Sequence, residues 1–262
     1  MTKEKLGEYL KPIAVRMFGK QGAGPRYQRP QFTIRPLAAM LEDLAQISDE
    51  NWYRYAFSTE PLNGKFTDEQ RHAYAIKAMD CGKTYAQKLM QEYQVTNALQ
   101  LGRALKMEIS YPDYPEKTDR VTFAEFREPN KINIYMDAVR RSRVSLKDEA
   151  VCAVMGENPD ISNILLAHEL FHYVEEVHKK EIYTRTEKIN LWHIGPFYNR
   201  STVIAFSEIA AMAFAKELTG ISFSPYLLDV FLVYGYSPQE ASGLYEIMMQ
   251  FAGLPIIERN TI

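Results

Sequence analysis

The sequence predicts an α+β fold that is mainly helical and contains one small antiparallel sheet of three strands. Apolar residues recur at helical spacing over most of the 262 residues, whereas between Met107 and Asp137 the apolar spacing changes to two, which is typical of strands. Hydrophobic residues make up 46% of the chain, enough to bury a substantial core. The chain is therefore expected to form one large domain, or one domain with an appendage.

Residues 1–66 are expected to form an N-terminal helical extension, to which the sequence assigns no role. Apolar spacing predicts a helix over Lys3–Phe18 and further helical stretches near Pro36–Ile47 and Glu50–Phe57. Glycines and prolines between residues 19 and 30 predict a turn. Residues 67–262 are assigned to the main domain.

A capping box marks the start of the longest predicted helix. The side chain of Thr67 can accept a hydrogen bond from the backbone N–H of Gln70, and the Gln70 side chain can accept one from the backbone of Thr67. Apolar residues continue at helical spacing to about Tyr93. This helix is therefore expected over residues 67–93.

Three short strands are expected to follow. A short helix beginning at Ala98 runs into the first strand, near Leu105–Tyr111. Alternating apolar residues at 121–125 and 132–135 predict two more strands around the turn Glu128-Pro129-Asn130. An edge strand of such a sheet is a surface on which an extended peptide can dock.

Residues 168–172 carry the strongest functional signal in the chain. They read His-Glu-Leu-Phe-His and match H-E-x-x-H, the zinc-binding signature of metallopeptidases. Apolar residues around the motif predict a buried helix from Ser162 to His178, with Asp160 or Ser162 as its N-cap. Residues four apart share one helix face, so His168 and His172 can bind one metal ion, while Glu169 is placed to act as general base.

A catalytic zinc normally takes three protein ligands, and the sequence offers two candidates for the third. His178 fits the metzincin pattern H-E-x-x-H-x-x-G-x-x-H except that Glu175 replaces the glycine, and a glutamate favours continuing the helix, which would put His178 on the wrong face. Glu208 is the second candidate. It lies in the alanine-rich helical run 207–218, whose small side chains allow two helices to approach closely, as in a gluzincin.

These two motifs together resemble the ImmA/IrrE family of zinc metallopeptidases. Members of that family show A-H-E-L-x-H followed by E-x-x-A-x-x-F-A, which match Ala167–His172 and Glu208–Ala215. The resemblance covers roughly residues 70–250. Two departures are that Phe171 stands where many relatives carry glycine, and that the connection between the motifs is longer, around residues 183–200.

The resemblance implies zinc-dependent hydrolysis of a peptide bond in a protein substrate, such as a helix-turn-helix transcriptional repressor. Zn²⁺ would be held by His168, His172 and Glu208. His193 and Tyr198, in the longer connection, are candidates for stabilising the transition state. Two alternatives stay open: a metzincin-like protease that uses His178, and a catalytically inactive interaction or regulatory protein that zinc stabilises.

Charge and composition narrow the set of partners. The formal charge of −2 provides no drive toward nucleic acid, so no direct nucleic-acid binding is expected. The chain starts with charged residues and no apolar run follows them, and no segment is long and apolar enough to span a bilayer. These features predict a cytoplasmic protein without a membrane partner.

Cys81 and Cys152 are expected to be reduced thiols. Helices near 225–234 and 237–251 are expected to complete the domain by packing.

Overall fold

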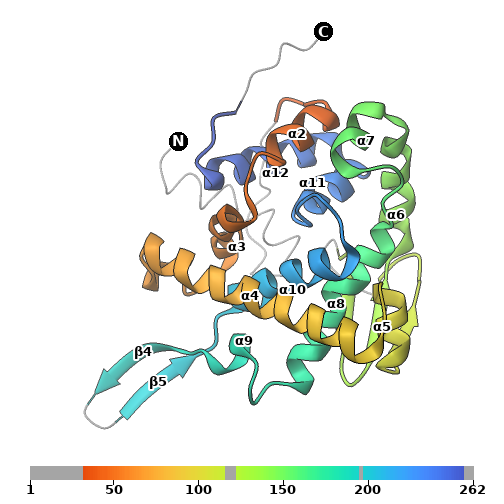
Figure 1. Ribbon diagram of the computed structural model, residues 1–262. Helices are drawn as coiled ribbons and strands as arrows, with labels where there is room; N and C mark the ends of the chain where they lie inside the picture. Colours follow the sequence, from red (N-terminus) through yellow and green to blue (C-terminus); the bar gives the residue numbers. More distant parts are fainter. Residues whose placement is uncertain (1–31, 116–121, 195–196, 257–262) are drawn as a thin grey trace.

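The computed structural model describes residues 32–115, 122–194 and 197–256. Helices dominate this part of the chain and surround a common core, as Figure 1 shows, and two small sheets complete the α+β fold. The helices are α2 (Leu37–Leu44), α3 (Tyr53–Ala56), α4 (Asp68–Tyr93), α5 (Ala98–Ala104), α6 (Met136–Arg143), α7 (Glu149–Met155), α8 (Ile161–Val177), α9 (Tyr183–Thr186), α10 (Ile204–Thr219), α11 (Leu227–Tyr234) and α12 (Pro238–Ala252). Short 3₁₀ turns lie at Asp49–Trp52, Phe57–Thr59, Asn63–Lys65 and Val144–Lys147.

The first sheet has the three predicted strands but is mixed. Its strands β1 (Glu108–Ser110), β2 (Ala124–Arg127) and β3 (Lys131–Ile134) lie in the order β1-β3-β2. β2 pairs antiparallel with β3 across the predicted turn, but β1 pairs parallel with β3. The prediction of a wholly antiparallel sheet was therefore wrong, because alternating apolar residues identify a strand and its faces without fixing which neighbour it pairs with.

A second sheet was not predicted as such. Strands β4 (Ile189–Ile194) and β5 (Phe197–Ser201) form an antiparallel hairpin within the long connection that separates α8 from α10. Figure 1 shows this hairpin extending away from the helices. Trp192 and Tyr198 are 50% and 57% exposed, whereas Ile189 at the start of β4 is only 9% exposed and belongs to the hydrophobic core.

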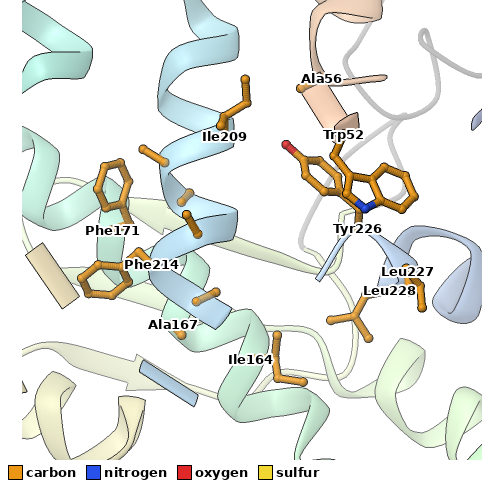
Figure 2. Packing of buried hydrophobic residues seen from close by; sticks show 14 of the residues in the cluster. Trp52, Ala56, Ile164, Ala167, Phe171, Ile209, Phe214, Tyr226, Leu227 and Leu228 are labelled. Carbon is orange, nitrogen blue, oxygen red and sulfur yellow. The ribbon is translucent and has the colours of Figure 1, made fainter. Parts of the chain in front are cut away.

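Helix α10 lies between α4 and α8, and small residues set its distance from α4. A Cβ atom added to Gly82 of α4 would lie 2.1 Å from the carbonyl oxygen of Ala210, closer than any real Cβ contact. On the α8 side, the rings of Phe171 and Phe214 pack with centroids 5.6 Å apart, and Figure 2 shows both rings between the two helices. Phe171, the departure from the family pattern, is thus part of the core.

Residues 32–66 contribute to the same hydrophobic core as the rest of the described chain. Leu41, Leu44 and Phe57 are fully buried, and Trp52 stacks on Tyr226 with ring centroids 5.1 Å apart (Figure 2). The boundary after residue 66 stays a prediction. The predicted helix Lys3–Phe18 and the turn at residues 19–30 lie outside the described residues.

The long helix begins as its sequence predicts. Thr67 is the N-cap of α4, and both hydrogen bonds of the capping box with Gln70 are present, at 3.2 and 2.9 Å. The two C-terminal helices also match the predicted ranges closely. Within the described ranges, no helix combines the length and apolar character needed to cross a bilayer. Both cysteines are free thiols.

Candidate metal centre

Helix α8 brings the two motif histidines together. The helix begins after Asp160, whose carboxylate accepts a hydrogen bond from the backbone N–H of Asn163 at 3.1 Å, as an N-cap does. One helical turn separates His168 from His172, and their Nε2 atoms lie 3.1 Å apart. The predicted helix is confirmed, and with it the shared face of the imidazoles.

Helix α10 places Glu208 opposite these imidazoles. Its Oε2 lies 3.5 Å from Nε2 of His168, and its Oε1 lies 3.8 Å from Nε2 of His172. These three residues offer ligand atoms that all lie within 4.8 Å of one another. Ligands about 2.1 Å from a tetrahedral zinc are roughly 3.4 Å apart, so the observed spacings fit one ion at their centre.

The charge of Glu208 and those of the two histidines also attract one another. Burial alone lowers the pKa of His168, but the hydrogen bond and charge of Glu208 outweigh it and raise this pKa to about 9. For Glu208, burial acts upward, whereas the hydrogen bond with His168 and the charges of both histidines lower the pKa to about 2. The triad therefore contains a carboxylate whose charge attracts a cation, either a proton on His168 or a metal ion.

Behind His172 lies a chain of polar contacts that joins α8, α9 and α10. The hydroxyl of Ser207 lies 3.3 Å from Nδ1 of His172 and donates a hydrogen bond to Oε2 of Glu175 at 2.9 Å. Arg185 of α9 pairs with the same oxygen of Glu175 at 3.0 Å. Glu175 is only 1% exposed, so this carboxylate is neutralised inside the protein.

A second carboxylate lies on the His168 side of the centre. Asp229 of α11 accepts a hydrogen bond from the hydroxyl of Tyr55 at 2.9 Å. Burial raises the pKa of Asp229 to about 6, although the Tyr55 hydrogen bond and the charge of His168 act in the opposite direction. Residues from α3 and α11 therefore influence the charge of a ligand on α8, which couples the 32–66 segment to the centre.

A cleft of about 480 Å³ borders the triad, through His172 and Glu208. Its walls come from α8, α9, α10, residues 202–204 and the end of β2, and they include Glu169, His172 and Glu208. Glu169 is 9% exposed and faces the cleft from the position next to His168. β2 is an edge strand of its sheet, and Phe126 brings this strand to the cleft wall.

His178 does not join the triad. Helix α8 continues past Glu175 to Val177, as expected for a glutamate at that position, and His178 is its C-cap. The Nδ1 atom of His178 lies 2.6 Å from Oε1 of Glu181, and its ring packs on Tyr85 with centroids 5.2 Å apart. His168, His172 and Glu208 thus lie together, whereas His178 contacts Glu181 and Tyr85 instead.

His193 and Tyr198 lie opposite each other in the β4–β5 hairpin. The Tyr198 ring is covered by the guanidinium of Arg200, 4.5 Å from the ring centroid, and is otherwise exposed. The hairpin leaves the body of the protein between α9 and α10, two elements that line the cleft (Figure 1). A role for either residue in stabilising the transition state stays a prediction.

The sequence did not point to Ser207, Arg185 or Asp229 as site residues, and it marked Glu175 only as a residue that favours continuing the helix. A usable signal was present for Glu175, because a glutamate among the apolar positions of a buried helix needs a partner. Asp229 gives the same signal within the apolar run Leu227–Tyr234. No such signal marks Ser207 or Arg185, whose partners are distant in sequence.

Comparisons of the chain with known protein families, with curated proteins and with solved structures gave no match. The resemblance to the ImmA/IrrE family therefore depends on the two motifs alone. What the structure adds is that the motif residues His168, His172 and Glu208 meet at one place in a mainly helical α+β fold, as a zincin site requires.

Proposed function

We propose that this protein is a zinc-dependent metallopeptidase of the gluzincin type, related to the ImmA/IrrE family. The observation that carries the proposal is the convergence of His168, His172 and Glu208, beside a cleft that His172, Glu208 and Glu169 line. Two imidazoles and one carboxylate form the donor set of catalytic zinc sites, which leave a position open, whereas structural sites close all four positions with protein ligands.

Different residues of the chain have different roles in peptide hydrolysis. Zn²⁺ at this centre would supply Lewis acidity to a water molecule and to the substrate carbonyl. Glu169 removes a proton from the attacking water and returns it to the leaving nitrogen as the peptide bond breaks. The walls of the cleft position the substrate, and β2 offers an edge along which an extended peptide backbone can form hydrogen bonds.

The substrate we propose is a protein, and the family resemblance favours a helix-turn-helix transcriptional repressor. A cytoplasmic location fits such a substrate. The formal net charge of −2 supports contact with a protein over direct contact with nucleic acid. A gene for a short repressor beside the gene for this protein would support this choice.

Metal analysis of the purified protein tests the centre. We expect about one zinc ion per chain in the unsubstituted protein and in His178→Ala, and loss of most of it in Glu208→Gln. Glu217→Gln is the matched control, because it removes a carboxylate from the same helix at a residue that accepts a hydrogen bond from Gln87 and is not part of the triad. Zinc retained by Glu208→Gln but lost from His178→Ala would instead support the metzincin alternative.

The Glu169→Gln variant separates an enzyme from a zinc-stabilised interaction protein. The variant should keep its zinc, because residue 169 is not a ligand, and should lose peptide cleavage by roughly 10²- to 10⁴-fold, the usual contribution of a general base. Cleavage of a repressor or of a fluorogenic peptide library is the measurement. If regulation of a partner persisted undiminished in this variant, the protein would act by binding alone.

A further inference from the structure

The buried carboxylate of Glu175 needs an explanation. Its side chain is 1% exposed on helix α8, one turn beyond His172. Burying an ionised group is energetically unfavourable, because the group loses its contacts with water. An opposite charge and hydrogen bonds inside the protein can offset this loss. An apolar residue at this position would fill the same helix face without that cost, so the carboxylate is expected to serve a purpose beyond packing.

Its contacts point to His172. Arg185 supplies the opposite charge at 3.0 Å, and Ser207 donates its only hydroxyl proton to Glu175 at 2.9 Å. The same hydroxyl oxygen lies 3.3 Å from Nδ1 of His172. Because its proton is already committed to Glu175, this oxygen can only accept a hydrogen bond from the imidazole.

The direction of these hydrogen bonds fixes the state of the ring. If Ser207 accepts at Nδ1, then His172 carries its proton on Nδ1 and presents a lone pair at Nε2. Nε2 is the nitrogen that lies 3.1 Å from Nε2 of His168 and 3.8 Å from Oε1 of Glu208. The tautomer that the Ser207 hydrogen bond at Nδ1 selects is therefore the one whose Nε2 can bind a metal ion.

We propose that Glu175 is a positioning residue that acts through Ser207 to hold His172 in the ring orientation and tautomer required of a metal ligand. Arg185 supplies the opposite charge at 3.0 Å and holds the Glu175 carboxylate in place. This inference rests on the proposed metal centre and adds to it the residues that contact the ligand His172 rather than the ion. It also gives a role to the residue that occupies the glycine position of the metzincin pattern.

A direct ligand role for Glu175 does not fit the geometry. Its carboxylate lies on the Nδ1 side of His172, beyond Ser207, whereas the triad gathers on the Nε2 side. A simple ion pair with Arg185 does not account for the contacts either, because such a pair has no need for a serine that also reaches the imidazole. The serine hydroxyl is the feature that separates positioning from ordinary charge neutralisation.

The test compares Ser207→Ala with Ser207→Thr. Zinc affinity, measured by competition with a chromophoric chelator, should fall about 10- to 100-fold in Ser207→Ala, the range found when outer partners of ligating histidines are removed. Ser207→Thr keeps the hydroxyl and should stay close to the unsubstituted protein. Glu175→Gln should also weaken zinc binding. Ser222→Ala, at an exposed serine in the loop after α10, is the matched control and should have no effect.

Nitrogen NMR of His172 provides a readout that a merely structural role would not change. The metal-free protein should show the Nδ1–H tautomer, and Ser207→Ala should shift the population toward Nε2–H. Unchanged tautomer and unchanged zinc affinity in a folded Ser207→Ala protein would overturn the proposal. If the unsubstituted protein bound no zinc, the metal centre would fail, while the tautomer measurement would still decide whether Ser207 controls the ring.

Discussion

The β4–β5 hairpin lies in the chain between α8 and α10, but the hairpin and the helix pair are held in place in different ways. On α10, Ala210, Ala211 and Phe214 are fully buried between α4 and α8. In the hairpin, Trp192 and Tyr198 are half or more exposed, and Figure 1 shows the strands extending away from the helices. Neighbours on several sides fix the helices, whereas the hairpin is fixed chiefly by its own strand pairing.

This contrast explains why the candidate residues on the helices lie together, whereas those on the hairpin are not placed in the triad. The candidate ligands on the helices have their positions set by helix periodicity and by packing on both sides, so they meet within the distances that a metal ion requires. His193 and Tyr198 share a register in the hairpin, and Tyr198 is 57% exposed. Four substitutions test this difference between the helix pair and the hairpin.

Phe214→Ala should have the largest effect. Phe214 is 0% exposed and packs on Phe171 at the α8–α10 interface, so the change leaves a cavity and should destabilise the protein by about 3–5 kcal/mol. Urea-induced unfolding followed by circular dichroism measures the loss. A loss below about 1 kcal/mol would mean that this interface repacks easily and does not hold the ligands rigidly.

His193→Ala tests whether the hairpin takes part in the chemistry. If His193 stabilises the transition state, kcat for a peptide substrate should fall by about 10²- to 10³-fold with zinc content unchanged. The hairpin would then have to reach the cleft during the reaction. An unchanged kcat would remove His193 from the mechanism and leave the helices as the source of all catalytic groups.

Gly82→Ala tests the close approach of α4 and α10. The added Cβ meets the backbone oxygen of Ala210 at 2.1 Å, and backbone cannot move aside cheaply, so the protein should lose about 1–3 kcal/mol of stability. Zinc affinity should fall as well, because α10 carries Glu208. Gly64→Ala is the control: an added Cβ there has no heavy atom within 4 Å, and stability should not fall. Equal behaviour of the two variants would contradict the packing argument.

Trp192→Ala should have the smallest effect. Half of the Trp192 side chain is exposed on the hairpin, and substitutions of this kind change stability by no more than about 0.5 kcal/mol. Thermal unfolding and zinc content should both match those of the unsubstituted protein. A loss comparable to that of Phe214→Ala would show that the hairpin packs on the body of the protein after all.

Most of the helical fold followed from local patterns in the sequence. The capping box at Thr67 located the start of α4, and apolar spacing located α8, α11 and α12, because these signals depend on residues within one or two turns of each other. The pairing of β1 with β3 did not follow. The β4–β5 hairpin was also missed as a sheet: β4 carries apolar residues at Ile189, Leu191 and Ile194, but β5 ends in the polar run Asn199-Arg200-Ser201, and neither strand identifies the other as its partner.

A spacing of four residues already places His168 and His172 on one face of a helix, because the helix repeat fixes it. Local helix geometry also favoured Glu208 over His178 as the third ligand, because Glu175 favours continuing the helix and would put His178 on the wrong face. Only the tertiary structure decided that α10 lies across α8 so that Glu208 faces the imidazoles, and that Ser207 and Glu175 stand behind His172. The physical reason is that helix–helix placement depends on the packing of side chains far apart in sequence, such as Gly82 against Ala210, and no local spacing encodes that contact.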